Sequence, residues 1–190
     1  MGVEQTVKGG QPFVPVTDGV HKAIGDPGVN ATETWAAMHK TIFNFSNTPI
    51  PTTDSAGVAG YGSKKLYDFL AGVIEIFGIV VNLTTQKQGA GIAASAAVVA
   101  SIGSAPAAAD ATLTGTEADM IASTVATLNA SGAGTFKAKT GATPIQFDGS
   151  TTPLDMYLNI AIPDAGSTAN DALLVTGTIA VFWTNLGKAT

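Results

Sequence analysis

The chain has 190 residues, a net charge of −5, 45% hydrophobic residues and only 12% charged ones. This length favours a single domain with a buried core, and a composition so apolar and so poor in charge excludes an intrinsically disordered chain. All nine basic residues are lysine, which argues against nucleic-acid binding, and the lack of cysteine excludes disulfides, thiolate nucleophiles and zinc fingers.

Residues 1–35 are rich in turn formers and are predicted to form an extended arm in front of a domain that spans residues 36–190. Pro12 and Pro15 interrupt an apolar island at residues 13–16, and neither proline suits a central strand. Arms of this kind commonly become ordered only when they meet a partner. The first residues lack the basic and apolar segments of a secretory signal.

Three strands are predicted next, over residues 39–46, 64–69 and 73–85. Prolines 49 and 51 and the glycines up to Gly62 predict a loop after the first strand, and Gly72 predicts a bend before the third. The third strand is apolar on both faces, which predicts that it lies at the centre of the core. The apolar run around it is too short for a membrane-spanning helix and holds Glu75 at its centre, so we expect no membrane association.

The following stretch is predicted to contain a packed loop and the only helix. Residues 89–109 are mainly Ala, Gly and Ser, which favours a surface excursion or packed loop. A helix is predicted over 117–128 because apolar residues recur there at helical spacing, and Thr114 with Glu117 resembles a capping box. Residues 134–147 are predicted to form one or two short strands, followed by a turn at residues 148–150.

Two closing runs, Leu154–Ile162 and Leu173–Asn185, alternate between apolar and polar residues, as half-buried strands do. The predicted inward residues are Leu154, Met156, Leu158, Ile160 and Ile162 in the first run, and Leu173, Val175, Ile179, Val181 and Trp183 in the second. Leu174 and Phe182 interrupt the polar face of the second run, so we expect part of that face to touch another surface. The sequence therefore predicts an all-β fold: a single, jelly-roll-like β-sandwich with an extended N-terminal arm and at most one short helix.

No catalytic motif stands out, so the chain is not expected to be an enzyme or to bind a cofactor or a metal ion. His21 lies in the arm and His39 opens a strand, and both are expected to be ordinary surface or strand-edge residues. Asp148, Asp155 and Asp164 could converge on calcium, but no Asp-x-Asp-x-Asp-Gly loop is present, and turn capping is the favoured interpretation.

Four segments of the chain resemble a group of structural proteins from the virions of tailed bacteriophages. They are Gly60–Phe69 (GYGSKKLYDF) with Gly72–Ile74, Ala111–Asp119 (ATLTGTEAD), Asp155–Asn159 (DMYLN) and Thr176–Gly187 (TGTIAVFWTNLG). The resemblance covers residues 55–187. Members of the group often carry Pro-Glu before the glycine at 72, where this chain has Leu70-Ala71.

The resemblance implies a capsid cement, or decoration, protein on the surface of the virion. Such a protein would bind the major capsid protein, bridge neighbouring capsomers and stabilise the head against the pressure of internal DNA. A homotrimer is expected, because it matches the local three-fold axes of the shell. On this interpretation Phe13, Val14 and Val16 of the arm would contact the capsid, and Tyr157, Phe182 and Trp183 would contact a second subunit. The alternative is a spike or fibre protein that binds a receptor or glycan, with Tyr157 and Trp183 as stacking residues.

Overall fold

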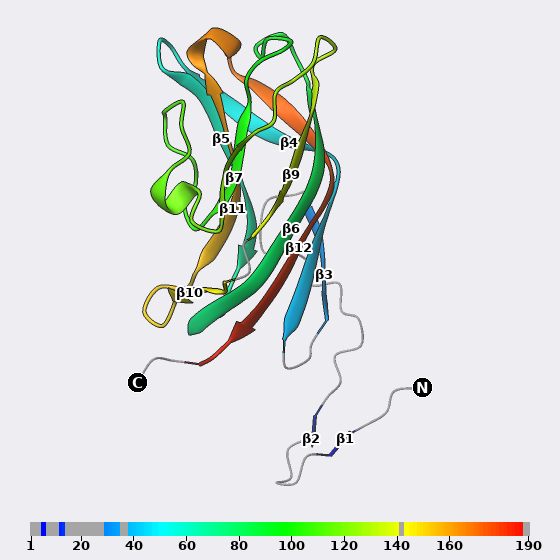
Figure 1. Ribbon diagram of the computed structural model, residues 1–190, viewed down its shortest axis with the longest axis vertical. Coiled ribbons are helices and arrows are strands. Elements are labelled where there is room, and N and C mark those ends of the chain that lie inside the picture. The colour runs from blue at the N-terminus through cyan, green and yellow to red at the C-terminus, as the bar shows by residue number, and fades with distance from the viewer. Residues whose placement is uncertain (1–4, 7–11, 14–28, 35–37, 141–142, 188–190) are drawn as a thin grey trace.

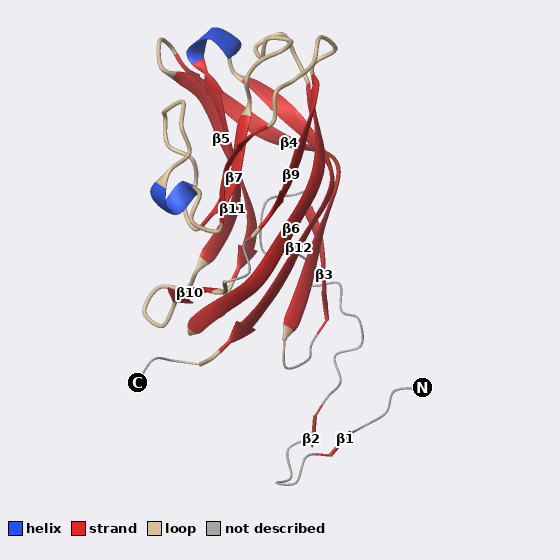
Figure 2. Cartoon of the chain, viewed as in Figure 1, coloured by secondary structure: helices blue, strands red, loops and turns tan. Residues whose placement is uncertain are grey.

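The computed structural model describes residues 5–6, 12–13, 29–34, 38–140 and 143–187, with side chains described from Met38 onward, and this part of the chain is almost entirely β-structure (Figures 1 and 2). The strands are β1 (Gln5–Thr6), β2 (Pro12–Phe13), β3 (Val29–Thr34), β4 (His39–Ser55), β5 (Ala59–Asp68), β6 (Val73–Lys87), β7 (Val99–Gly103), β8 (Ile121–Val125), β9 (Ala133–Lys139), β10 (Ile145–Asp148), β11 (Asp155–Pro163) and β12 (Asp171–Asn185). Two 3-10 turns, η1 (Gly115–Glu117) and η2 (Asp164–Gly166), provide the helical residues among those described.

Strands β3 to β12 form one ten-stranded antiparallel sheet that folds round on itself into a nearly closed sandwich (Figure 1). Its order is β10-β6-β12-β4-β5-β11-β7-β8, with β9 also paired to β6 and β3 also paired to β4. We call β3, β4, β12, β6, β9 and β10 the large layer, and β5, β11, β7 and β8 the small layer. Strand β4 connects the layers through its hairpin with β5, and β8 contacts β9 across the open side. The predicted all-β sandwich is thereby confirmed.

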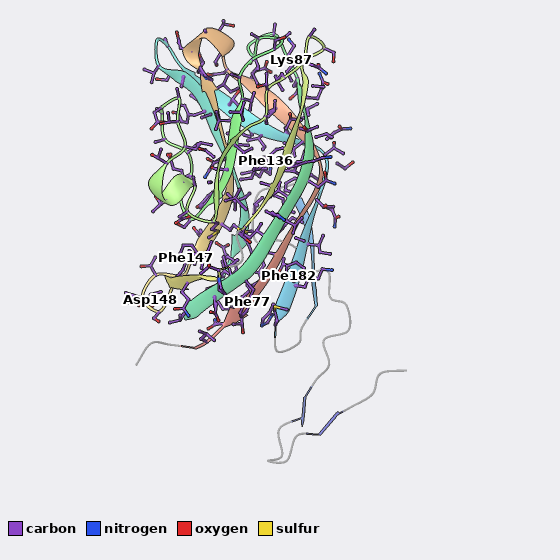
Figure 3. The ribbon with its side chains drawn as sticks, viewed as in Figure 1. Phe77, Lys87, Phe136, Phe147, Asp148 and Phe182 are labelled. Atoms are coloured by element: carbon purple, nitrogen blue, oxygen red, sulfur yellow. The ribbon has the colours of Figure 1, made fainter. Side chains whose placement is uncertain are left out.

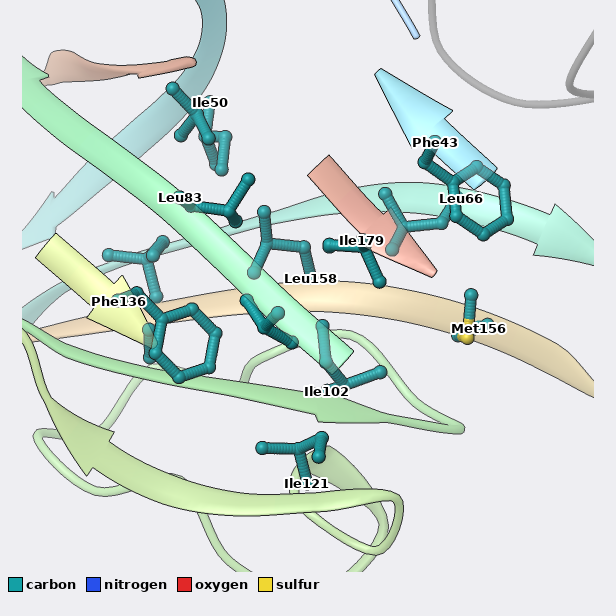
Figure 4. Packing of buried hydrophobic residues seen from close by; sticks show 14 of the residues in the cluster. Phe43, Ile50, Leu66, Leu83, Ile102, Ile121, Phe136, Met156, Leu158 and Ile179 are labelled. Atoms are coloured by element: carbon teal, nitrogen blue, oxygen red, sulfur yellow. The ribbon is translucent and has the colours of Figure 1, made fainter. Parts of the chain in front are cut away.

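The core lies between the two layers and is filled by the alternating residues that the sequence indicates (Figure 4). All ten residues predicted to point inward are buried, none more than 8% exposed: nine lie in β11 and β12, and Leu154 directly precedes β11. Leu83 and Phe136 from the large layer and Ile102 and Leu158 from the small layer belong to the same cluster. Burial of this continuous apolar surface is the main force that holds the layers together.

Two β-bulges change which residues of β6 and β4 point inward. The pairing of β6 with β12 shifts at Phe182/Trp183, so Phe77 is an extra residue and the inward face changes phase from Ile74 and Ile76 to Ile79. The two apolar faces predicted for β6 are therefore largely one buried face with a change of phase. A similar shift opposite Val175/Gly177 changes the phase of β4 beside Asn47, which has a φ of 49°.

The loop predicted from Pro49 onward is wrong, because β4 continues through both prolines to Ser55. Along one edge, this stretch pairs with β12 as far as Thr52. On the other edge, β3 pairs only as far as Phe45 and β5 pairs only from Thr53, within the described residues. Proline lacks the N–H group that a second neighbouring strand would need, so it fits this single-sided stretch.

The predicted helix over 117–128 is also wrong, although its capping box is present. Thr114 and Glu117 cap the short turn η1, which ends at Ala118, and residues 121–125 then form strand β8. Strand β8 pairs with β7 through contacts such as Val99 with Val125. The β-branched residues of this segment favour a strand once an unpaired strand edge is offered to them.

The Ala-rich segment 89–109 is more ordered than a packed loop. It contains β7, which lies between β11 and β8, and Ile92, Val98 and Ile102 are completely buried. The prediction of one or two short strands over 134–147 is confirmed: two are present, β9 and β10, and they follow one another along the same edge of β6. The bend at Gly72 is confirmed by its φ of +145°.

Strand β3 lies within the predicted arm and pairs with residues 40–45 of β4, so the end of that segment belongs to the large layer. Strands β1 and β2 pair with each other. The remaining residues of the arm lie outside the described part of the chain.

Candidate functional site

The described residues contain no group of three or more His, Cys, Asp or Glu side chains that could hold a metal ion. The ring of His39 is stacked on the ring of Trp183, with centroids 4.3 Å apart. His21 lies outside the described residues.

The three aspartates considered for calcium each bind a different partner. Asp148 accepts a hydrogen bond from the backbone N–H of Ser150, at 3.0 Å, and Asp164 accepts one from Gly57, at 2.9 Å. Asp155 lies 3.0 Å from the ammonium group of Lys65. Turn capping and ion pairing therefore account for these carboxylates.

A charged cluster lies where β5 meets β11 and consists of Lys65, Asp68, Asp155 and Tyr157. Lys65 pairs with both carboxylates, and the Tyr157 hydroxyl donates a hydrogen bond to Asp155, at 3.0 Å. Burial opposes ionisation of Asp155, but the ion pair with Lys65 and the hydrogen bonds from Lys65 and Tyr157 outweigh it, so the pKa of Asp155 is lowered. The pKa of Lys65 is raised, chiefly by its hydrogen bond to Asp68. These groups therefore stabilise one another.

A buried polar network fixes the long segment between β7 and β8 against the small layer. Asn159 in β11 is completely buried, and its side-chain amide donates hydrogen bonds to the backbone carbonyls of Ala105, at 2.9 Å, and Glu117, at 2.8 Å. Its side-chain oxygen accepts from the Ser63 hydroxyl, at 2.7 Å, and from the backbone N–H of Ala107, at 3.1 Å. The sequence placed Asn159 on the polar face of its strand but did not reveal what covers it.

Glu117, which itself belongs to the segment between β7 and β8, also stabilises that segment. Its carboxylate accepts hydrogen bonds from the backbone N–H groups of Ala108, at 2.5 Å, and Thr114, at 3.2 Å. Gly103 leaves room for the backbone of Thr116 and Glu117, because a Cβ at Gly103 would collide with both. The segment is therefore a fixed surface feature of the protein.

The outer face of the large layer is a regular surface built on four paired strands, and we call the outward side chains of β4, β12, β6 and β9 the docking face. Cross-strand pairing arranges them in rows, of which two are Ile42–Ala180–Val80–Lys139 and Asn44–Thr178–Asn82–Lys137. Next to the first row, Phe182 pairs with Lys40 and Gly78, beside the bulged Phe77 (Figure 3). Val80 is 50% exposed and Phe77 is 38% exposed.

Three lysines border the apolar part of the docking face, and one carboxylate, Glu75, lies on the outward side of β6 two residues before Phe77 and accepts a hydrogen bond from Gln146 at 3.5 Å. Lys40, Lys137 and Lys139 are all exposed there, and the Lys40 ammonium lies over the ring of Phe182, 5.7 Å from its centroid. None of the three lysines has a carboxylate partner among the described residues. A shallow hollow of about 290 Å³ is lined by Val80 and by residues 137–139 of β9.

A second feature is a polar groove of about 520 Å³ at the other end of the same layer. It is lined by Asn47, Thr84, Thr85, Gln86, Thr127, Asn129, Ala133, Gly134, Thr135, Leu174 and Thr176. The Thr176 hydroxyl accepts from the backbone N–H of Asn47, at 3.0 Å, and the buried Thr85 hydroxyl has no hydrogen-bond partner among the described residues. The lining has no charged or aromatic side chain.

The three aromatic residues expected at a subunit interface occupy different surroundings. Trp183 is 1% exposed and belongs to the core, so it offers no surface to a sugar or to a second subunit. Phe182 lies on the docking face, and Tyr157 is half-buried beside Lys65. Of the expected capsid contacts, Val14 and Val16 lie outside the described residues, and Phe13 is described only as part of β2.

Comparisons with known proteins found no matching family model, no matching curated protein and no matching solved structure. Among the described residues, no helix is long and apolar enough to cross a membrane. The function must therefore be inferred from the sequence of the protein and from its surfaces.

Proposed function

We propose that this protein is a bacteriophage capsid cement protein that binds the outer surface of the major capsid protein shell. There it bridges neighbouring capsomers and stabilises the head against the pressure of internal DNA. The sequence resemblance supplies the class of protein, and the surface of the large layer supplies a means of attachment.

The observation that supports this proposal most directly is the docking face. Its centre carries Ile42, Val80 and Ala180 in one row and neutral Asn and Thr side chains in the next, on strands held rigid by pairing on both sides. Exposed apolar residues gathered on one face of a soluble protein commonly mark a site of protein contact. A preorganised surface of this kind suits binding to an already folded shell, since little conformational entropy is lost.

Several copies acting together would give the attachment its strength. We propose a homotrimer, whose three docking faces would meet equivalent sites around a local three-fold axis of the shell. Linked contacts of modest strength give a combined affinity far above that of one contact. Light scattering on a sizing column tests this: a mass near three times 19.1 kDa is expected, and a monomer at all concentrations would contradict it.

Co-sedimentation with shells assembled from the major capsid protein of the same genome tests the proposed function. The wild-type protein should pellet with the shells and raise the temperature at which they break open. Val80→Asp, which places a charge at the centre of the docking face, should reduce binding at least about tenfold, because that charge would be desolvated on contact. Thr151→Asp is the matched control, since Thr151 is exposed and lies outside this face. Failure of the wild-type protein to bind the shells would refute the proposal.

The polar groove favours a second candidate function, namely a spike or fibre-type protein that binds a receptor or glycan. Neutral hydroxyl and amide groups such as Asn47, Gln86 and Thr135 can exchange hydrogen bonds with sugar hydroxyls. Because Trp183 is buried, such a site would work without the aromatic stacking expected from the sequence. A glycan array separates the two functions: specific hits abolished by Thr135→Val would favour glycan binding, and a blank array would remove it.

A further inference from the structure

The docking face has two unlike halves, and the difference indicates the chemistry of its partner. The half next to the groove, around Thr84 and Thr176, is neutral and polar. The other half combines exposed apolar residues, Phe77 and Val80, with positive charge.

The positive charge on this second half of the docking face is unusual for this chain. The protein carries a net charge of −5, yet Lys40, Lys137 and Lys139 are all exposed on one half of one face. Lys65, by contrast, is paired with carboxylates, and the Lys87 ammonium donates to the backbone carbonyls of Gly89 and Ile92. The three lysines of the docking face are thus available for an outside partner.

We infer that the lysine-bearing half of the docking face binds an acidic protein surface, in which an apolar spot is bordered by carboxylates. This inference rests on the proposed function and makes the acidic surface a part of the shell subunit. Val80, Ala180 and the edge of Phe182 would cover the apolar spot. Lys40 on one side and Lys137 and Lys139 on the other would reach its carboxylates, which fixes the orientation of the bound protein.

A second copy of this chain is a poorer occupant, because its own carboxylates are largely engaged. Most carboxylates of the described domain accept hydrogen bonds or ion pairs from their own chain: Asp68, Asp110, Glu117, Asp119, Asp148, Asp155, Asp164 and Asp171. Binding three lysines of a neighbour would disrupt some of these contacts. An acidic patch on a different protein has no such cost.

The partner should be recognised largely through charge, so its binding should depend on salt. Exposed charges interact over about 10 Å at 0.1 M salt and over only about 3 Å at 1 M. We therefore expect the affinity of the wild-type protein for shells to fall steeply as salt is raised. The apolar centre should leave a residual affinity at high salt.

Two triple variants test the inference by co-sedimentation with shells at low and high salt. Lys40→Gln, Lys137→Gln and Lys139→Gln together remove the positive charges of the face. The control combines Gln88→Glu, Ala122→Glu and Thr151→Glu, which are exposed outside the face and lower the net charge by the same amount. We expect the lysine variant to bind at least about tenfold more weakly at low salt and to lose most of its salt dependence, while the control binds almost as wild type does.

The outcomes separate this inference from the proposed function. If the wild-type protein does not bind shells at all, both are overturned. If it binds but the lysine variant keeps the wild-type affinity and salt dependence, the acidic partner is excluded and the cement function stands. If the lysine variant instead changes the native mass in light scattering, the face joins two copies of this chain, which also overturns the inference. Circular dichroism melts confirm that each variant is folded.

Discussion

The indole nitrogen of Trp183 donates a hydrogen bond to the hydroxyl of Thr41 at 2.9 Å, across 142 residues of sequence. Both residues are 1% exposed, and the bond joins β12 to β4 at one end of the core. Phe69 and Tyr67 meet the same indole edge-on, with centroids 5.0 and 5.8 Å away. The polar atoms are therefore satisfied inside an aromatic cluster that connects the two layers.

Replacing Trp183 by Phe should destabilise the protein by about 2 to 3 kcal/mol, because it leaves a cavity and a buried hydroxyl without its donor. Urea unfolding followed by far-ultraviolet circular dichroism measures the change. In the Phe variant, Thr41→Val should cost less than it does in the wild-type protein, since the bond has already been lost. Equal costs of Thr41→Val in both backgrounds would show that the hydrogen bond contributes nothing.

The sequence predicts this fold well where one buried face alternates without interruption. In β11 and β12 the period of two identifies every inward residue, because each strand has one core side over its whole length. The sequence predicts the inward residues less well where a bulge changes the phase of the alternation, as at Phe77 and Asn47. An extra residue in a strand leaves no mark in the local composition.

The helix that was wrongly predicted over 117–128 shows a different limit of prediction from a single sequence. Residues 117–128 have apolar residues at helical spacing and a genuine capping box, so local signals agree with one another. The segment forms β8 because β7 offers it an unpaired edge, and β7 lies in an Ala-rich stretch whose strand was itself missed. Non-local pairing decided the outcome, and a single sequence does not show it.

The candidate site was predictable only in part. Phe182 and Leu174 stand out in the sequence as apolar residues on a polar strand face, and Phe182 does lie on the docking face. Trp183 directly follows Phe182 in the chain, yet it points into the core, because neighbouring residues of a strand point to opposite faces. The three lysines come from β4 and β9, which are far apart in the sequence, and only the pairing of both with the strands between them brings the charges together.

The stability contributed by Asp155 should depend on pH on the acid side. Its folded pKa is lowered, so its contribution is fully present above the unfolded pKa of about 3.9 and is lost as the pH falls through the folded value. Asp155→Asn should therefore cost up to about 1 kcal/mol at pH 7, since the pair with Lys65 is partly exposed. The difference between variant and wild type should shrink towards zero near pH 2, as measured by urea unfolding at each pH. A difference that stays constant with pH would contradict this assignment.

Gly177 should tolerate no side chain. It has a φ of +130°, and a Cβ there would collide with the backbone carbonyl of Asn82 on β6. Gly177→Ala is therefore expected to destabilise the protein by at least about 2 kcal/mol, through backbone strain and steric overlap. Gly57→Ala is the matched control, because Gly57 also has a positive φ, +75°, but a Cβ at that position would meet no atom within 4 Å. Thermal melts should place the Gly177 variant well below the control, and equal melting temperatures would exclude the overlap.

Asn159 should be the residue on which the segment between β7 and β8 depends most. Asn159→Leu fits the strand but leaves the carbonyl of Ala105 without its donor and the hydroxyl of Ser63 without its acceptor. The carbonyl of Glu117 then keeps only the Ser101 hydroxyl as a donor. Unsatisfied buried groups cost about 1 to 3 kcal/mol each, so we expect a loss of about 3 kcal/mol, with local opening of the segment. Hydrogen exchange should rise first at residues 104–117, while the amides of β6 and β12 stay protected. Asn82→Leu, on the exposed outer face of β6, is the control and should leave exchange of this segment unchanged. Uniformly faster exchange across the whole protein would mean that Asn159 supports the core as a whole, because a local anchor would release only the segment that it holds.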